Sequence, residues 1–209
     1  MSDQAADGAE DGGAAEHAAK KAKIKAAKDK LYASKTIEKG LIMVHTGKGK
    51  GKSTAAWGLV MRSLGHHKKI GVVQFVKGRR ETGERQFLER FPELVTIKVM
   101  GEGFTWETQD KERDIAAARA AFEAAKEMFQ DPELHLIVLD EINIVLRYDY
   151  LPINEVVDAL LAKRPDLHVV CTGRNAKDEL IEVADLVTEM SLIKHPFRAG
   201  IKGQLGIEF

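Results

Sequence analysis

Short apolar segments alternate with longer stretches of mixed polarity along this chain from about residue 40 onward. The apolar segments predict β-strands, because branched aliphatic residues follow one another without a helical spacing. They cover residues 41–45, 70–76, 95–100, 134–139, 167–171 and 186–193. The stretches between them repeat apolar residues every three to four positions and predict helices. These helices are expected over residues 52–64, 83–90, 109–129, 154–162 and 177–183.

Strands and helices therefore alternate, and the strands are apolar on both faces. Such strands are typical of a parallel sheet that helices cover on each side. The expected fold class is α/β, with a mostly parallel sheet and helices on both faces. Ligands of such sheets bind beyond the carboxyl ends of the strands. The loops that follow Val44, Val76, Met100, Leu139 and Cys171 are thus the places to look for a site.

The first 39 residues have a different composition. Residues 1–19 carry five acidic side chains and no Lys or Arg, and they predict disorder because almost nothing apolar offsets chain entropy. Residues 20–39 carry eight Lys against two acids, and the Lys/Ala stretch over 18–33 favours a helix. We expect a flexible charged segment over residues 1–39 and one domain over 40–209. The segment is either a solvated tail or a helix that docks on a partner or over the active site.

The overall composition narrows the function classes. The 209 residues contain 32 Lys and Arg and 32 Asp and Glu, and this balance argues against a general nucleic-acid binder. No apolar run is long enough to cross a bilayer, and the first twenty residues lack the apolar core of a signal peptide. Cys171 is the only cysteine, so no intrachain disulfide forms. We expect a cytoplasmic protein that does not bind membranes.

The loop after the first expected strand carries the most specific signal. It reads Thr-Gly-Lys-Gly-Lys-Gly-Lys-Ser-Thr over residues 46–54, directly before a helix. This is the context of a phosphate-binding P-loop, where glycines let backbone N–H groups surround phosphate oxygens. Lys52 is placed to reach the terminal phosphates and Ser53 to bind Mg²⁺. The alternative is a plain glycine-rich turn.

The spacing of this loop departs from the usual consensus. The first consensus glycine would fall at position 46, where the chain has Thr46. The glycines stand instead at Gly47, Gly49 and Gly51, with additional lysines at Lys48 and Lys50. We infer that the phosphate chain lies differently from that in an ordinary ATPase.

An acidic pair follows the apolar segment 134–139. Asp140 and Glu141 fit the second acidic motif of P-loop proteins, and they would meet Mg²⁺ from the neighbouring strand end. The alternative is that both acids cap the next helix. Other signals are weaker. Asn175, Lys177 and Asp178 only approximate a guanine-specific motif, the seven histidines share no ligand spacing, and Cys171 is expected to be an inert packed thiol.

Several further motifs occur together in register. They are residues 101–109 with Phe104 and Trp106, 139–142, 148–151, 172–175 and 194–202. With the loop over 46–53, this set resembles the ATP:corrinoid adenosyltransferases of bacterial cobalamin synthesis. The resemblance runs from about residue 25 to residue 209. One departure is Asn175-Ala176, where the family often has Gly followed by Cys.

The resemblance implies an enzyme that transfers the 5′-deoxyadenosyl group of ATP to the Co(I) of a reduced corrinoid and releases triphosphate. It further implies a RecA-like P-loop fold in three layers, a homodimer, and ATP bound with its triphosphate reversed. Mg²⁺ or Mn²⁺ is the implied metal, and reduced flavin or a flavodoxin is the implied reductant. The pathway is cobalamin biosynthesis or salvage.

The resemblance also assigns site residues. The catalytic set is Lys52, Glu141, Phe104 and Trp106. The nucleotide-binding set is Thr46, Gly47, Lys48, Gly49, Lys50, Gly51, Lys52, Ser53, Thr54, Arg62 and Arg174. The metal ligands are Ser53, Asp140 and Glu141. Phe104 and Trp106 would line the corrin site and exclude an axial cobalt ligand, which makes Co(II) easier to reduce; the alternative is a hydrophobic plug of the loop.

Two other functions fit the loop alone. A RecA-like ATPase acting with nucleic acid would hydrolyse the γ-phosphate and respond to polynucleotide. A nucleotide-sensing interaction protein would bind without turnover. The neutral charge argues against the first, and the adjacent acids Asp140 and Glu141 are poorly explained by the second.

Overall fold

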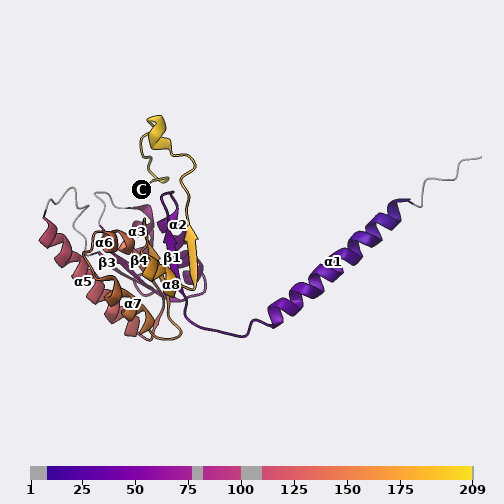
Figure 1. Ribbon diagram of the computed structural model, residues 1–209, viewed down its shortest axis with the longest axis horizontal. Helices are drawn as coiled ribbons and strands as arrows, with labels where there is room; N and C mark the ends of the chain where they lie inside the picture. Colours follow the sequence, from indigo (N-terminus) through magenta and orange to yellow (C-terminus); the bar gives the residue numbers. More distant parts are fainter. Residues whose placement is uncertain (1–8, 77–81, 100–109, 209) are drawn as a thin grey trace, which may run out of the picture. The chain divides into compact units, whose positions relative to one another are not determined.

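The computed structural model describes residues 9–76, 82–99 and 110–208. The chain divides into two units, with the boundary between Glu38 and Lys39. The described part of the first unit holds one helix, α1 (Ala9–Ala33) (Figure 1). The expected disorder is therefore wrong for residues 9–19, since alanine has the highest helix propensity and extends the helix beyond the Lys/Ala stretch.

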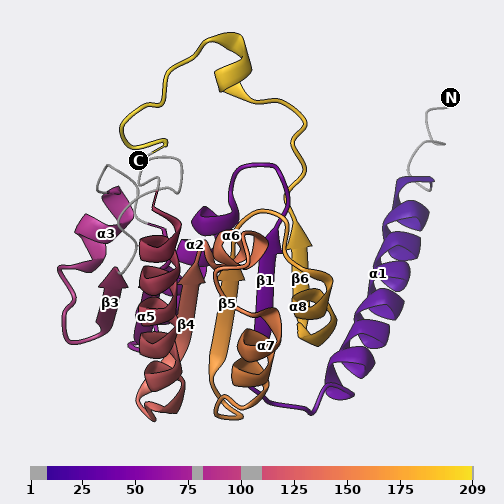
Figure 2. The ribbon, with the colours of Figure 1, turned by 60° about the vertical axis from the view of Figure 1, so that its left-hand side comes forward.

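The second unit is built on a six-stranded sheet in the order β3-β2-β4-β5-β1-β6. Every recorded strand pairing is parallel, and Figure 2 shows the strands running in one direction. The strands are β1 (Ile42–Thr46), β2 (Lys69–Gln74), β3 (Val95–Val99), β4 (Leu134–Asp140), β5 (His168–Thr172) and β6 (Leu186–Glu189). The expected α/β class with a parallel sheet is confirmed.

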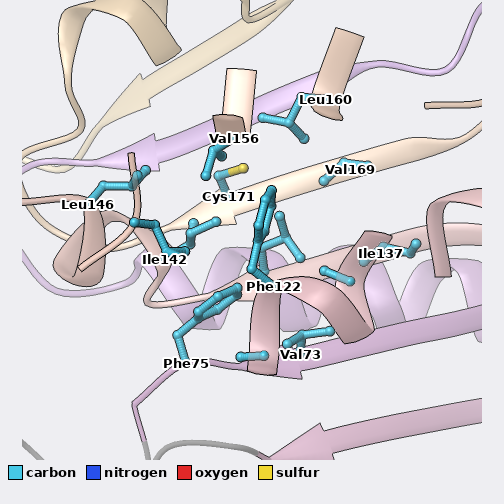
Figure 3. Packing of buried hydrophobic residues seen from close by; sticks show 14 of the residues in the cluster. Val73, Phe75, Phe122, Ile137, Ile142, Leu146, Val156, Leu160, Val169 and Cys171 are labelled. Carbon is cyan, nitrogen blue, oxygen red and sulfur yellow. The ribbon is translucent and has the colours of Figure 1, made fainter. Parts of the chain in front are cut away.

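Helices pack on both faces of this sheet. They are α2 (Lys52–Leu64), α3 (Gly83–Leu88), α5 (Lys111–Gln130), α6 (Ile142–Arg147), α7 (Ile153–Leu161) and α8 (Asp178–Val183), followed by a 3₁₀ turn, η1 (Pro196–Ala199). One apolar core joins the sheet to α5, α6, α7 and α8, with Phe122 at its centre (Figure 3). A second core joins the opposite face to α2 through Trp57 and to α3 through Leu88. The result is the expected three-layer arrangement.

The edge strands differ from the expectation that all strands are apolar on both faces. β1 is buried throughout and β2, β4 and β5 nearly so, whereas β3 alternates and β6 is exposed at all four positions. β6 also ends at Glu189 rather than at 193. The N–H of Met190 still donates to Thr46, the last residue of β1, but its carbonyl accepts from the N–H of Gly49 in the loop after β1. No helix in the described ranges combines the length and apolarity needed to span a membrane.

The chain enters β1 through a set of fixed contacts at the amino ends of the strands. The backbone N–H of Leu41 donates to Nδ1 of His168 (3.1 Å), and that of Ile42 donates to Asp185 (2.9 Å). The buried ammonium of Lys163 donates to the carbonyl of Gly40 (2.9 Å). These contacts fix β1 at the end opposite the P-loop.

Candidate active site

The glycines of the loop between β1 and α2 each have a structural reason. A Cβ on Gly47 would lie 2.5 Å from the carbonyl oxygen of Met190, and one on Gly49 would lie 2.6 Å from that of Ser191. Gly51 has open space around it but a φ of +110°, which side chains disfavour. The segment after β6 therefore accounts for the glycines at 47 and 49, and the backbone conformation accounts for the one at 51.

Lys52 is the first residue of α2 and only 6% exposed. Its ammonium donates to the carbonyl of Gly49, within the same loop. Burial lowers the pKa of Lys52; Glu141 acts in the opposite direction, and Arg174 and Lys50 lower the pKa further. The loop thus holds a desolvated cation that a phosphate oxygen can bind in place of the carbonyl.

The other two lysines of the loop face solvent. Lys48 and Lys50 are exposed, and the ammonium of Lys50 forms an ion pair with the carboxylate of Glu208 near the end of the chain. Sequence reasoning did not find Glu208, because 158 residues separate the partners. In Figure 2 the segment after β6 arches over the carboxyl ends of the strands and returns toward the loop.

Asp140 ends β4 and collects hydrogen bonds from three elements. Its Oδ1 accepts from the hydroxyl of Ser53 (2.8 Å) and from that of Thr172 (2.8 Å), and Gln74 donates to Oδ2 (3.4 Å). β5 lies between β1 and β4, so the expectation that Asp140 follows the strand next to the P-loop strand is wrong. Thr172, at the end of β5, fills this gap, and sequence reasoning missed it.

Glu141 is held in a strained and desolvated position. Its φ is +63°, its N–H donates to Thr172 Oγ1 (2.9 Å), and among the described residues its buried Oε2 has no hydrogen-bond partner. Burial raises the pKa of Glu141 to about 7; Asp140 adds to this rise, and Lys52 and Arg174 oppose it. A buried acid with an unpartnered oxygen beside two cations is typical of a functional site.

Arg174 lies in the loop after β5. Arg174 is an exposed residue, and its charge is close enough to Lys52 and Glu141 to lower the pKa of both. On one side of it the amide of Asn143 donates to the carbonyl of Gly173 (3.0 Å), and on the other Thr46 Oγ1 accepts from the N–H of Ala176 (3.0 Å). Asn143 is a further residue that the sequence analysis did not select.

Not every predicted site residue is at this edge of the sheet. The loop residues 46–53, Asp140, Glu141 and Arg174 are brought together, and Thr54 lies exposed in the first turn of α2. Arg62 is exposed in the last turn of α2, ten residues beyond Lys52, which places it about 15 Å along the helix. A contact from Arg62 to the nucleotide stays a prediction. Phe104 and Trp106 lie outside the described residues.

Neither the thiol of Cys171 nor Lys177 of the approximate guanine motif is assigned to the site. Cys171 is fully buried, and burial raises its pKa to about 12, which agrees with the expected inert thiol. Lys177 of the approximate guanine motif instead donates to Asp149 (2.5 Å).

The arrangement suits a metal-bound polyphosphate. Four cations lie at the carboxyl-end edge of the sheet: Lys48, Lys50, Lys52 and Arg174. Oxygen atoms are supplied at the same edge by the hydroxyl of Ser53 and the carboxylates of Asp140 and Glu141. Ammonium, guanidinium and backbone N–H groups bind phosphate oxygens, and hard divalent cations prefer oxygen ligands. Hydrolysis of a nucleotide and transfer of its nucleoside group both need such a site.

Comparison with known proteins separates these possibilities. The family model described as ATP:corrinoid adenosyltransferase BtuR/CobO/CobP matches residues 38–209. A corrinoid adenosyltransferase from Sinorhizobium sp is 58% identical over 197 residues, which are 93% of this chain and 92% of that protein. Corrinoid adenosyltransferase CobA of Salmonella typhimurium is 46% identical over 187 residues, covering 90% and 94%. The RadB recombinase structure shows a weak likeness, with a TM-score of 0.47 and 18% identity over 75% of this chain and 77% of that one.

Proposed function

Because this chain belongs to the ATP:corrinoid adenosyltransferase family and is a transferase, we propose that it transfers the 5′-deoxyadenosyl group of ATP to the Co(I) of a reduced corrinoid. The electron pair of Co(I) forms the bond from cobalt to C5′. The bond between C5′ and the triphosphate oxygen breaks, and its electron pair leaves with inorganic triphosphate. The proposed setting is cobalamin biosynthesis or salvage.

The observation that best supports this reaction is the buried ammonium of Lys52 in a loop with two further lysines. In hydrolysis of the γ-phosphate, negative charge develops mainly at one end of the polyphosphate. In attack on C5′ the whole triphosphate is the leaving group, so cations are needed along its length. Lys48, Lys50 and Lys52 supply them at alternate positions, and Arg174 adds a fourth from the loop after β5.

A divalent cation fits the oxygen donors at this edge. Ser53 and Asp140 are in direct contact, and Glu141 offers a buried oxygen without a hydrogen-bond partner in the described part of the chain. Within that part no three His, Cys, Asp or Glu side chains gather as a metal-binding group, so phosphate oxygens would have to complete the ligand set. Ser53, Asp140 and Glu141 would hold Mg²⁺, or Mn²⁺, together with these oxygens. The bound ion would supply charge neutralisation of the leaving group.

Side chains around the loop also orient the nucleotide. The ammonium of Lys52 leaves the carbonyl of Gly49, to which it donates in the ligand-free protein, and binds a phosphate oxygen instead. Glu141 binds the metal or a ribose hydroxyl once it loses its proton, and the nearby Lys52 and Arg174 favour that ionised form. Thr54, exposed in the first turn of α2, would bind a phosphate oxygen.

The rest of the proposal depends on the family resemblance. Phe104 and Trp106 would form the apolar wall of the corrin site, a homodimer is the expected assembly, and a reduced flavin or flavodoxin is the expected electron donor. These predictions concern residues outside the described ranges, or partners, and each is tested by its own experiment.

The test mixes the protein with ATP, Mg²⁺ and chemically reduced corrinoid and follows the light-sensitive Co–C bond spectroscopically. The proposal predicts bond formation that stops when ATP is omitted and falls about 100-fold or more in Lys52→Ala. Lys69→Ala is the matched control, because Lys69 pairs with Glu133 at the amino end of β2. A RecA-like ATPase would instead release ADP and phosphate, faster with polynucleotide, and form no Co–C bond.

A further inference from the structure

The loop after β5 is held at both ends by side chains of other elements. Asn143, in α6, donates from Nδ2 to the carbonyl of Gly173. Thr46, at the end of β1, accepts the N–H of Ala176 with its hydroxyl oxygen. Arg174 lies between these two attachment points, so they fix the stretch of backbone that carries its side chain.

This stretch of backbone requires such support. Gly173 has a φ of +125° and Asn175 one of +55°, so two of three consecutive residues have left-handed values. A Cβ on Gly173 would lie 2.9 Å from the Cβ of Asn143 and 3.0 Å from Oε2 of Glu141. Strained backbone persists where surrounding contacts fix it, and it is concentrated at functional sites.

Thr46 stands where the ordinary P-loop consensus has its first glycine. It is 7% exposed, its carbonyl accepts from the N–H of Met190 (2.9 Å), and its hydroxyl oxygen accepts from Ala176 (3.0 Å). The side chain that a glycine would lack is thus used to join the phosphate loop to the Arg174 loop. A valine has nearly the same shape as threonine but cannot accept this hydrogen bond.

Geometry places the held loop at the site. Gly173, directly before Arg174, comes so close to Glu141 that an added Cβ would lie 3.0 Å from Oε2, and Ala176, two residues after Arg174, donates to Thr46 directly before the phosphate loop. The two attachment points belong to β1, which leads into that loop, and to α6, which follows Glu141. The position of Arg174 therefore depends on β1 and α6 together.

We propose that Thr46 and Asn143 are positioning residues, which hold the loop 173–176 so that Arg174 binds the triphosphate beside Lys52. This inference rests on the proposed function, since it assigns Arg174 to the same polyanion. Thr46 then acts through Arg174 and makes no phosphate contact with its own side chain.

A double-mutant cycle tests this. The affinity for inorganic triphosphate with Mg²⁺ is measured by calorimetry for the full chain, Thr46→Val, Arg174→Ala and the double variant. Thr46→Val should weaken binding about fivefold and Arg174→Ala about tenfold, while the double variant should bind no more weakly than Arg174→Ala. Thr46→Ser keeps the hydroxyl and should bind within about twofold of the unchanged protein.

Two controls keep the result specific. Thr96→Val makes the same change at an exposed position on the edge strand β3 and should leave affinity unchanged. Thermal unfolding shows whether Thr46→Val still folds; if it does not, Asn143→Ala replaces it in the cycle with the same expected non-additivity.

The inference is overturned if the losses from Thr46→Val and Arg174→Ala add, if Thr46→Ser is as weak as Thr46→Val, or if Arg174→Ala binds triphosphate normally. Failure of the proposed function gives a different result. The cycle would then show the expected coupling, yet the unchanged protein would form no Co–C bond with reduced corrinoid.

Discussion

The hydroxyl of Ser53 donates a 2.8 Å hydrogen bond to Oδ1 of Asp140, which lies 87 residues later in the chain. The same oxygen accepts from Thr172, so one carboxylate joins the phosphate loop, β4 and β5. The contact places two oxygen atoms that can bind a divalent cation, one from Ser53 and one from Asp140, at the first residues of α2. The ammonium of Lys52 lies there too. This is the geometric basis for assigning a metal-bound triphosphate to this edge.

Asp140→Asn should separate metal-dependent from metal-independent binding. The substitution keeps the size of the side chain but removes the negative charge that a divalent cation needs. We expect triphosphate affinity in the presence of Mg²⁺ to fall about tenfold or more, with little change when EDTA is present. Titration calorimetry in both conditions measures this. Asp166→Asn, exposed before β5, is the matched control. Equal losses with and without Mg²⁺ would show that Asp140 only supports the fold.

Glu141→Gln should stabilise the ligand-free protein at pH 8. The pKa of Glu141 is raised to about 7 from an ordinary value of 4.5, so between these values the folded protein holds a proton that the unfolded chain has lost. Stability therefore falls as the pH rises through this window. Removal of the charge should raise the free energy of unfolding at pH 8 by on the order of 2 kcal/mol and leave it nearly unchanged at pH 4.

Urea unfolding of both proteins at the two pH values measures this difference. The same variant should lose activity, because glutamine is a poor ligand for the proposed metal. A variant that is less stable than the unchanged protein at pH 8 would mean that Glu141 is well satisfied in the folded state.

His168 should make the protein less stable in mild acid. Burial lowers the pKa of His168, with His135 and Lys163 adding to the effect and Asp166 opposing it. Its Nδ1 accepts the N–H of Leu41, which only the neutral ring can do. The unfolded chain therefore gains a proton near pH 6.5 that the folded protein resists, and stability is lost as the pH falls below that value.

His168→Asn offers a test, since an amide oxygen can accept from Leu41 but does not titrate. The unfolding temperature of the variant should fall less between pH 7 and pH 5.5 than that of the unchanged protein. An equal fall in both would assign the acid sensitivity to other groups, of which His135 is the first candidate because burial lowers its pKa too.

Glu208→Gln should tighten triphosphate binding. The carboxylate of Glu208 neutralises Lys50, one of the three loop lysines assigned to the leaving group. Since the pair is partly exposed, its loss should raise affinity only about threefold at low ionic strength and less at high salt. Glu133→Gln, which removes the distant pair with Lys69, is the control. Weaker binding in Glu208→Gln would show that the carboxylate orients Lys50 for the ligand.

The sequence predicted the elements that local patterns determine. The strand, glycine–lysine loop and helix over residues 42–64 follow from local rules, and the α2 limits were predicted to the residue. The six-residue α6 was missed, because it begins directly after a left-handed Glu141 and is too short to show a helical repeat.

Contacts between distant segments could not be predicted in the same way. Local pattern does not give strand order, and so β5 between β1 and β4 was unexpected, as was the role of Thr172. The partner of Lys50 lies near the chain end, and Thr46 accepts a hydrogen bond from Ala176, 130 residues away. Arg62 was assigned from the family resemblance, and its contact with the nucleotide stays a prediction.

The central claim is that the loop between β1 and α2 binds a triphosphate that leaves as one unit from C5′. The most direct test is ³¹P NMR of the phosphorus products formed from ATP, Mg²⁺ and reduced corrinoid, with Co–C bonds counted in the same sample. The account predicts one inorganic triphosphate for each Co–C bond and none without corrinoid. Accumulation of ADP and orthophosphate, at a rate that does not depend on corrinoid, would contradict it.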